Sequence, residues 1–169
     1  GLVCASRGKP VQIKRGEKPM NPRNIFIHKD AVVETADIGE GTRVWRNVHI
    51  LPGAVIGRDC NIGAGCYVEG RVRIGNGVTV KNNVALWDRI TIGDDVFIGP
   101  AAVFTNDFKP RAFRKKTSDD LIETHIGSGA TIGANATVVC GIRVHEYALI
   151  GAGSVVTRDV PAHHLVYGN

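Results

Sequence analysis

Large apolar residues recur at every sixth position over most of this chain. The series runs without a break from Ile38 to Phe104, then resumes at Ile126 and continues to Val156. Phe26 and Val32 extend it towards the N-terminus. The members between these limits are Ile38, Val44, Ile50, Ile56, Ile62, Val68, Ile74, Val80, Leu86, Ile92, Ile98, Phe104, Ile126, Ile132, Val138, Val144, Ile150 and Val156.

A period of six predicts short strands separated by turns. Helices repeat about every 3.6 residues and strands every two, so the series is not helical. Glycine often follows a series residue, as tight turns require. Three strand–turn units make one triangular coil of about 18 residues, and coils stack about 4.8 Å apart into a parallel β-helix. The two stretches hold about 20 units, so we expect an all-β fold of about seven triangular coils with one extended loop.

A second inward column lies two residues before each series position. Its members are often small, and they include Ala36, Cys60 and Cys66. Free cysteine behaves as a small hydrophobe, so we expect Cys60 and Cys66 to be core residues. None of the four cysteines forms a C-x-x-C pair, which argues against a zinc knuckle or a redox motif. A reducing, cytoplasmic setting is the simplest interpretation.

One of the three predicted corners lacks the turn glycine. On the first face Ile38, Ile56, Ile74 and Ile92 are each followed by glycine, whereas on the third face the series residue is followed by larger side chains. The side chains predicted along this third edge are Leu51, Glu69, Trp87-Asp88 and Thr105-Asn106. Turn formation alone accounts for single Asp and Asn residues. A tryptophan at an edge needs cover, so the sequence predicts that a ligand or a neighbouring subunit covers this edge.

The series loses its register in the stretch "VFTNDFKPRAFRKKTSDDLIETHIG", which covers residues 103–127. The stretch holds about 16 more residues than the period needs, and loops of this length are usually functional or disordered. Lys109, Arg111 and Arg114 make it basic. We expect either a solvated flap or a flap over a phosphate-bearing substrate, for which arginine has suitable geometry.

Composition narrows the class of protein. The chain has 169 residues and a net charge of +5, which is mild for a nucleic-acid partner but suits a phosphate-bearing ligand. No apolar run approaches the roughly 18 residues of a membrane span, and no signal peptide is visible. We expect one domain with a lead-in at 1–25, coils at 26–104, an inserted loop at 105–125, coils at 126–161 and a tail at 162–169.

The period-six pattern resembles that of the hexapeptide-repeat acyltransferases. The segment 82–113 is more specific and is similar to the nucleotide-sugar 3-amino-sugar N-acetyltransferases, which act on dTDP-linked 3-amino-3,6-dideoxyhexoses or UDP-linked 3-amino glucuronates. The motifs that carry this resemblance are Asn83–Asp88, Asp94–Pro100, Phe104–Asn106, Pro110-Arg111, 129–141 and 151–169. The resemblance implies a left-handed β-helix, a homotrimer, and acetyl transfer from acetyl-CoA to a sugar amine for surface polysaccharide synthesis. The residues present in these motifs favour a dTDP-linked sugar over a UDP-linked sugar as the substrate.

The edge cluster supplies the candidate substrate residues. We expect Asp88 to orient the amine or take its proton, and Asn83 to hydrogen-bond the amine or the sugar. The residues expected to bind the nucleotide sugar are Glu69, Trp87, Asn106, Asp107 and Arg111. By the resemblance, acetyl-CoA lies in a groove between neighbouring subunits. Ala134 and Ala152 would then contact its pantetheine arm, and Thr157 and Arg158 its phosphates.

Three other functions stay open at this point. A hydroxyl-acetylating enzyme would use a histidine base, for which His125, at the return of the loop, is the secondary candidate. The six histidines are His28, His49, His125, His145, His163 and His164. A β-helical carbonic anhydrase needs three histidines on zinc, and no H-x4-H spacing exists, so no metal is expected. An inert β-helical scaffold would not need a polar edge and a basic loop together.

Overall fold

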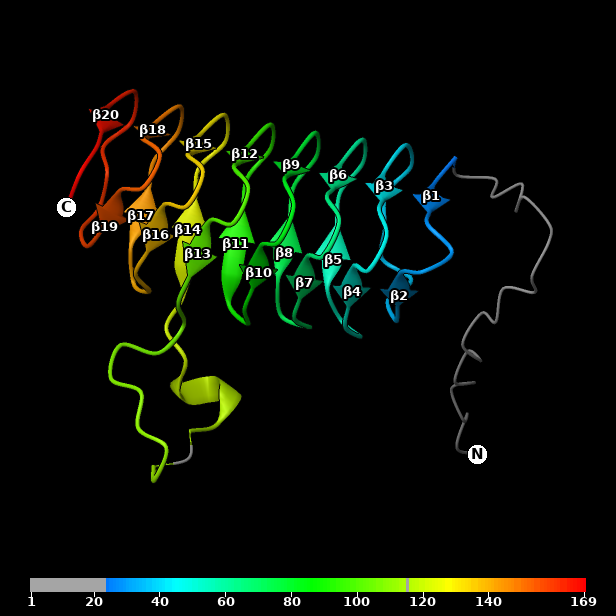
Figure 1. Ribbon diagram of the computed structural model, residues 1–169, viewed down its shortest axis with the longest axis horizontal. Helices are drawn as coiled ribbons and strands as arrows, with labels where there is room; N and C mark the ends of the chain where they lie inside the picture. Colours follow the sequence, from blue (N-terminus) through cyan, green and yellow to red (C-terminus); the bar gives the residue numbers. More distant parts are fainter. Residues whose placement is uncertain (1–23, 115) are drawn as a thin grey trace, which may run out of the picture.

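The chain folds into a stack of short parallel strands. The computed structural model describes residues 24–114 and 116–169, and Figure 1 shows the coils side by side along one axis. The strands are β1 (Phe26–Ile27), β2 (Val32–Val33), β3 (Arg43–Val44), β4 (His49–Ile50), β5 (Val55–Ile56), β6 (Asn61–Ile62), β7 (Tyr67–Val68), β8 (Arg73–Ile74), β9 (Thr79–Val80), β10 (Ala85–Leu86), β11 (Ile90–Ile92), β12 (Phe97–Ile98), β13 (Val103–Phe104), β14 (Thr124–Ile126), β15 (Thr131–Ile132), β16 (Thr137–Val138), β17 (Arg143–Val144), β18 (Leu149–Ile150), β19 (Val155–Val156) and β20 (Leu165–Val166). One short 3₁₀ helix, η1 (Ser118–Asp120), lies in the loop.

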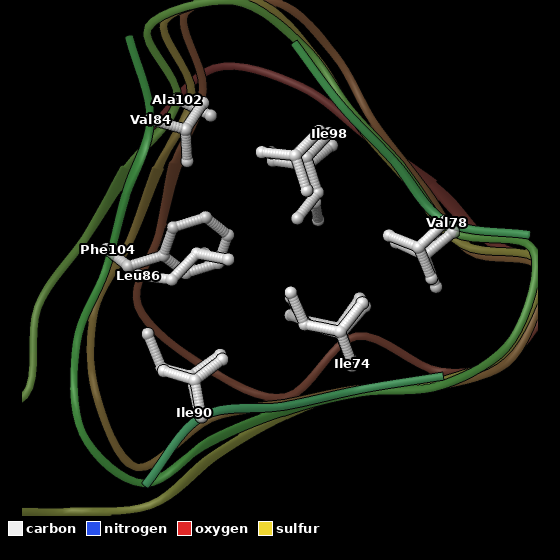
Figure 2. Packing of buried hydrophobic residues seen from close by; sticks show 14 of the residues in the cluster. Ile74, Val78, Val84, Leu86, Ile90, Ile98, Ala102 and Phe104 are labelled. Atoms are coloured by element: carbon white, nitrogen blue, oxygen red, sulfur yellow. The ribbon is translucent and has the colours of Figure 1, made fainter. Parts of the chain in front are cut away.

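The strands form three walls around a triangular interior (Figure 2). Wall A is the sheet β1-β3-β6-β9-β12-β15-β18-β20. Wall B consists of the sheet β2-β4-β7-β10 followed by the sheet β13-β16-β19, in which β13 is the last strand before the loop. Wall C is β5-β8-β11-β14-β17. The chain visits walls C, A and B in turn, so the edges are named the C–A, A–B and B–C corners. Every strand pair is parallel, as expected for a left-handed β-helix.

The period-six residues fill the interior, as predicted. Val44, Ile62, Val80 and Ile98 have no exposed surface and pair in register along wall A. A buried aliphatic side chain contributes about 1.5–3 kcal/mol, so the column is the main source of stability.

The second inward column is confirmed at both cysteines. Cys60 and Cys66 are buried, and their Sγ atoms lie 3.1 Å from the carbonyl oxygens of Gly75 and Lys81. Burial raises the pKa of both thiols, so they stay protonated and inert.

The first coil departs from the predicted register. Ile27 pairs with Val44 and Val33 with Ile50, so Ile27 and Val33 face inward. Phe26 and Val32, which the series had included, are 44% and 52% exposed. The prediction was wrong because the turn before Ile38 is one residue shorter than the period. Ala36, expected to face inward, is exposed for the same reason.

The stack has slightly more coils than the seven or so that the sequence predicted. Wall A has eight strands, because β20 pairs with β18 inside the segment expected to be a tail. The loop returns slightly before the predicted boundary, since β14 begins at Thr124. No helix in residues 24–114 and 116–169 is long and apolar enough to span a membrane.

Candidate active site

Two carboxylates meet at the B–C corner, in the predicted edge cluster. The Asp88 N–H donates to Glu69 Oε2 at 2.6 Å, and the Arg71 N–H donates to Asp88 Oδ1 at 2.8 Å. Each carboxylate thus uses one oxygen to cap a neighbouring rung. Among the described residues, Glu69 Oε1 and Asp88 Oδ2 have no hydrogen-bond donor. One acceptor on each side chain therefore remains available to a ligand.

A groove of about 570 Å³ opens beside these carboxylates. The residues lining it are Leu51, Pro52, Gly53, Glu69, Gly70, Arg71, Arg73 and Asp88. Arg71 and Arg73 were not anticipated from the sequence, although both stand just after the edge residues Glu69 and Gly70. The groove therefore combines acidic and basic groups within one corner.

Trp87 is held by the protein itself. Its Nε1–H donates to the Phe104 carbonyl oxygen at 2.9 Å, and its ring lies 5.8 Å from that of Tyr67. Tyr67 in turn meets His49 edge-on, and His49 Nε2 lies 2.7 Å from Glu34 Oε1. Tyr67 and the Phe104 carbonyl therefore supply part of the contact that a tryptophan at an edge needs. This favours a structural role for Trp87.

One hydrogen bond ties the neck of the loop to the next coil, and two others form within the loop itself. The Thr105 hydroxyl accepts a hydrogen bond from the Cys140 N–H at 2.9 Å, and the Asn106 carbonyl accepts one from the Ile122 N–H at 2.9 Å. Asp107 Oδ1 accepts the Lys109 N–H at 2.8 Å. These bonds close the base of the loop against wall B.

The charged residues of the outgoing leg pair locally. Lys116 Nζ pairs with Asp107 and lowers the pKa of that carboxyl. Arg111 is exposed, and its Nη1 donates to the neighbouring Pro110 carbonyl at 2.8 Å. Neither Asp107 nor Arg111 lines the groove beside Asp88.

The returning leg of the loop packs back towards the groove. At the start of η1, Asp120 Oδ2 accepts hydrogen bonds from the N–H and the hydroxyl of Thr117, both at 2.9 Å. Arg71 Nη1 then lies 2.8 Å from Asp119 Oδ1, and Arg89 Nη2 lies 2.8 Å from Glu123 Oε1. The Arg89 guanidinium holds the pKa of Glu123 below its usual range. Arg89 therefore anchors the returning leg of the loop, and Arg71 adds an exposed ion pair to it.

Asn83 lies at the A–B corner, at the other end of β10 from Asp88. Its φ of 61° is left-handed, a conformation that asparagine tolerates. The Asn83 side chain packs closely against Gly65 on the neighbouring rung, since a Cβ on Gly65 would lie 2.4 Å from Asn83 Oδ1. The five steps to Asp88 span roughly 16 Å of extended chain. The structure thus does not bring the two proposed catalytic residues together within one chain.

Two of the four expected cofactor residues share the A–B corner. Ala134 and Ala152 occupy adjacent rungs, and the Ala134 carbonyl accepts the Gly153 N–H at 2.8 Å. Neither alanine N–H has an acceptor among the described residues. Thr157 and Arg158 are exposed at the end of the B–C corner, away from the alanines.

The free alanine amides contrast with the C–A corner. There, the N–H groups of Arg58 and Asn76 donate to the next rung, to Asn76 Oδ1 at 2.9 Å and Asp94 Oδ1 at 2.6 Å. Alanine has no oxygen with which to cap a neighbour. The C-terminal part of the A–B corner therefore presents backbone donors to solvent, as a site for carbonyl groups requires.

His125 lies in a different groove, on the outer face of wall C. This groove has a volume of about 390 Å³ and is lined by Glu123, His125, Gly141, Ile142, Arg143, His145 and Asp159. His125 Nε2 lies 3.4 Å from Glu123 Oε2. Among the described residues no group of three His, Cys, Asp or Glu side chains could hold a metal ion. The structure therefore separates the secondary base candidate from Asp88.

Comparison with known proteins agrees with this architecture. The family model "Bacterial transferase hexapeptide (six repeats)" matches residues 35–70 and 123–158. A dTDP-3-amino-3,6-dideoxy-alpha-D-galactopyranose 3-N-acetyltransferase from Aneurinibacillus thermoaerophilus is 51% identical over 150 residues, which cover 85% of this chain and 74% of that protein.

Similar solved structures share the fold. One is PerB from Caulobacter crescentus in complex with CoA and GDP-perosamine, with a TM-score of 0.52, 25% identity, and coverage of 85% of this chain and 54% of that chain. Another is the acetyltransferase domain of PglB from Neisseria gonorrhoeae with acetyl coenzyme A, with a TM-score of 0.57, 22% identity, and coverage of 87% and 56%. The chain spans about half the length of these solved proteins. On the strength of the Aneurinibacillus relative, the chain belongs to the hexapeptide-repeat family of nucleotide-sugar N-acetyltransferases.

Proposed function

We propose that this protein transfers the acetyl group of acetyl-CoA to the 3-amino group of a dTDP-linked 3-amino-3,6-dideoxyhexose. The observation that carries the proposal is the 51% identity to an enzyme named for this reaction, extending over 85% of the chain. The product would be a building block for a surface polysaccharide. A groove with two carboxylates and two arginines suits a substrate that bears both an amine and a diphosphate.

The unpaired oxygens at the B–C corner would receive the sugar amine. Glu69 and Asp88 attract the ammonium form, and Asp88 Oδ2 is positioned to hydrogen-bond the amine once it is neutral. Only the neutral amine can attack, so one proton must leave before or during the attack. Asp88 is the proposed orienting residue and proton acceptor.

The free N–H groups of Ala134 and Ala152 would hold carbonyl groups of acetyl-CoA. In the reaction the amine nitrogen bonds to the thioester carbonyl carbon, and the carbon–sulfur bond breaks. The thiolate leaves with the electron pair, and the proton that Asp88 accepts from the amine is passed on to it, so that free CoA and the amide are the products. Backbone donors stabilise the charge that develops on the carbonyl oxygen in the transition state.

We propose a homotrimer that assembles the site between subunits. Asn83, Ala134 and Ala152 lie at one end of wall B and Asp88 at the other, so a single chain does not bring acetyl donor and amine together. The outward residues of walls A and B include Phe97, Leu149 and Val155, among other exposed apolar side chains. The outward residues of wall C are more polar and include Arg73, Thr91, His125 and Arg143. Analytical ultracentrifugation would test the assembly, and a monomer at micromolar concentration would contradict it.

The proposal also includes the other residues that were predicted to contact the nucleotide sugar or CoA. Asn106 and Asp107 stand at the neck of the loop, from which they could reach sugar hydroxyls of a ligand bound across the subunit boundary. Thr157 and Arg158 are exposed and open to the CoA phosphates. Trp87 and Arg111 are the weakest of the set. The Trp87 indole N–H already bonds to the chain, and neither residue lines the groove beside Asp88.

The free cysteines bear on the cellular compartment in which the protein works. Cys60, Cys66 and Cys140 are free thiols, as is usual in a reducing environment. We therefore propose that the reaction takes place in the cytoplasm.

The test is a coupled assay that follows release of the CoA thiol. The acceptors are dTDP- and UDP-linked 3-amino sugars, with the matching 3-hydroxy sugars as controls. We expect turnover with the dTDP amino sugar, less with the UDP amino sugar, and none with the 3-hydroxy sugars. No thiol release with either amino sugar would refute the proposal.

A second function, acetylation of a hydroxyl by a histidine base, rests on the contact between His125 and Glu123. A carboxylate beside an imidazole is the arrangement that orients a general base. Under this alternative the 3-hydroxy sugars react and His125→Ala loses activity. Under the main proposal His125→Ala keeps the activity on the amino sugar.

A further inference from the structure

Arg71 connects the carboxylate groove to the loop. Its backbone N–H is fixed by Asp88 Oδ1 at 2.8 Å, so the side chain starts directly beside the proposed amine site. The side chain is 48% exposed, and its Nη1 reaches Asp119 Oδ1 at 2.8 Å. Among the described residues, Nε and Nη2 of Arg71 have no acceptor. The guanidinium therefore holds one loop carboxylate and keeps donors for a second acceptor.

Asp119 contributes little to holding the loop in place. The loop is fixed instead by Arg89, whose Nη1 donates to the Asp119 carbonyl oxygen at 3.0 Å and whose Nη2 meets Glu123 at 2.8 Å. The Arg89 carbonyl also accepts the Thr124 N–H at 3.1 Å. By contrast the Asp119 side chain is 82% exposed. An exposed ion pair of this kind is weak and exchanges readily.

Arg73, the other arginine of the groove, is not available in the same way. Its Nη1 donates to the carbonyl oxygens of Gly53, Gly70 and Val72 at 2.9, 3.3 and 2.9 Å. These bonds tie its guanidinium to the corner backbone. Arg71 is therefore the groove arginine whose partner can be replaced without breaking the fold.

We propose that Arg71 binds the diphosphate of the nucleotide sugar, and that the Asp119 carboxylate occupies its guanidinium until that diphosphate displaces it. The assignment rests on the function proposed above and gives Arg71 the role that the sequence suggested for Arg111. A guanidinium pairs with carboxylate and phosphate in the same forked geometry. A diphosphate carries more charge than one carboxylate, so it wins the exchange.

The exchange explains why acidic and basic groups share one groove. Glu69 and Asp88 select a ligand with a cationic amine, and Arg71 selects one with an anionic phosphate. An amino sugar carried on a nucleoside diphosphate has both. Because Arg89 keeps the returning leg in place, the displacement of Asp119 leaves the loop where it is.

The experiment is a calorimetric titration of dTDP, with UDP as a second ligand, into the intact protein and three variants. We expect Arg71→Ala to raise the Kd for dTDP about tenfold or more, since it removes charge-assisted hydrogen bonds. Asp119→Ala removes the competitor and lowers the Kd by about two- to fivefold. In the double variant the Kd equals that of Arg71→Ala, because Asp119 has nothing left to compete for.

Matched controls separate binding from folding. Arg58→Ala removes an exposed arginine at the C–A corner and leaves the Kd unchanged, whereas Arg71→Lys keeps the charge and recovers part of the affinity. An unchanged Kd in Arg71→Ala overturns the assignment. A raised Kd in Asp119→Ala overturns the exchange, since Asp119 would then support the ligand.

The thiol-release assay keeps this inference distinct from the proposed function. If the amino sugars are acetylated but the Kd for dTDP does not depend on Arg71, the inference about Arg71 is wrong and the proposed function stands. If no amino sugar is acetylated while dTDP binding depends on Arg71 and Asp119 as described, the function fails and the inference stands.

Discussion

The C–A and B–C corners meet the same backbone demand with different chemistry. At the C–A corner glycine follows the series residue, and Asn76, Asp94 and Ser128 cap the amide of the rung before. At the B–C corner, Glu69 and Asp88 also cap amides, but one oxygen of each remains free beside a groove. A side chain that only satisfies its neighbour is structural, whereas one with spare hydrogen-bonding capacity can also bind a ligand.

The largest effect is expected where the C–A corner is most crowded. A Cβ on Gly57 would lie 2.4 Å from the Gly75 carbonyl oxygen and 2.5 Å from its carbon. Because backbone atoms must shift, we expect Gly57→Ala to lower the free energy of unfolding by about 3 kcal/mol in urea denaturation. Glu69→Ala, at the equivalent position of the B–C corner, should cost about 1 kcal/mol through the uncapped Asp88 amide. Equal losses would show that the corners do not differ in packing.

A second substitution introduces at the A–B corner the side-chain cap of a backbone N–H that the C–A corner already has. In Ala152→Asn the new side chain can cap the Ala134 N–H as Asp94 caps Asn76. Loss of one donor should raise the KM for acetyl-CoA roughly three- to tenfold. Ala64→Asn caps the same corner nearer the N-terminus and should leave the KM unchanged. An unaffected KM in Ala152→Asn would remove the alanine amides from the cofactor site.

Trp87 tests whether an edge aromatic is structural or binds substrate. Trp87→Phe keeps a ring against Tyr67 but loses the hydrogen bond to the Phe104 carbonyl. We expect a loss of about 1 kcal/mol in stability and little change in kcat/KM. A large fall in kcat/KM with unchanged stability would restore the substrate-binding role predicted for Trp87 from the sequence.

The smallest effect concerns pH and the anchor of the loop. Arg89 holds the pKa of Glu123 below that of the unfolded chain, so the pair stabilises the fold at pH values above the ordinary pKa of glutamate. This contribution is lost as the pH falls through the lower folded value. The Tm of Glu123→Gln should therefore lie slightly below that of the wild type at pH 7, and the gap should close in more acidic buffer. A gap that widens on acidification would contradict the pairing.

Most of the fold could be predicted because the interior repeats every six residues. The inward series from Ile38 to Val156 and the return at Ile126 are confirmed, since each coil imposes the same spacing. The first coil was misread because Phe26-Ile27 and Val32-Val33 each offer two adjacent apolar residues. The pattern alone cannot say which of each pair faces inward.

The candidate site was only partly predictable. Glu69 and Asp88 could be identified because, at their corner, glycine does not directly follow the series residue, and that replacement leaves a signal in the sequence. The contacts of Arg71 with Asp119, 48 positions away, depend on the path of the loop. The partner of the Trp87 indole is a backbone carbonyl, which leaves no signal in sequence at all.

The most direct measurement compares Asp88→Asn with Asp94→Asn. Both aspartates cap an amide through Oδ1, at 2.8 and 2.6 Å, and the amide oxygen of asparagine preserves that cap. They differ in that Asp88 lines the groove and Asp94 does not. In the thiol-release assay with a dTDP-linked 3-amino sugar, Asp88→Asn should lower kcat/KM by about 100-fold while Asp94→Asn leaves it unchanged. Equal values for the two variants would contradict the claim that the B–C corner carries the chemistry.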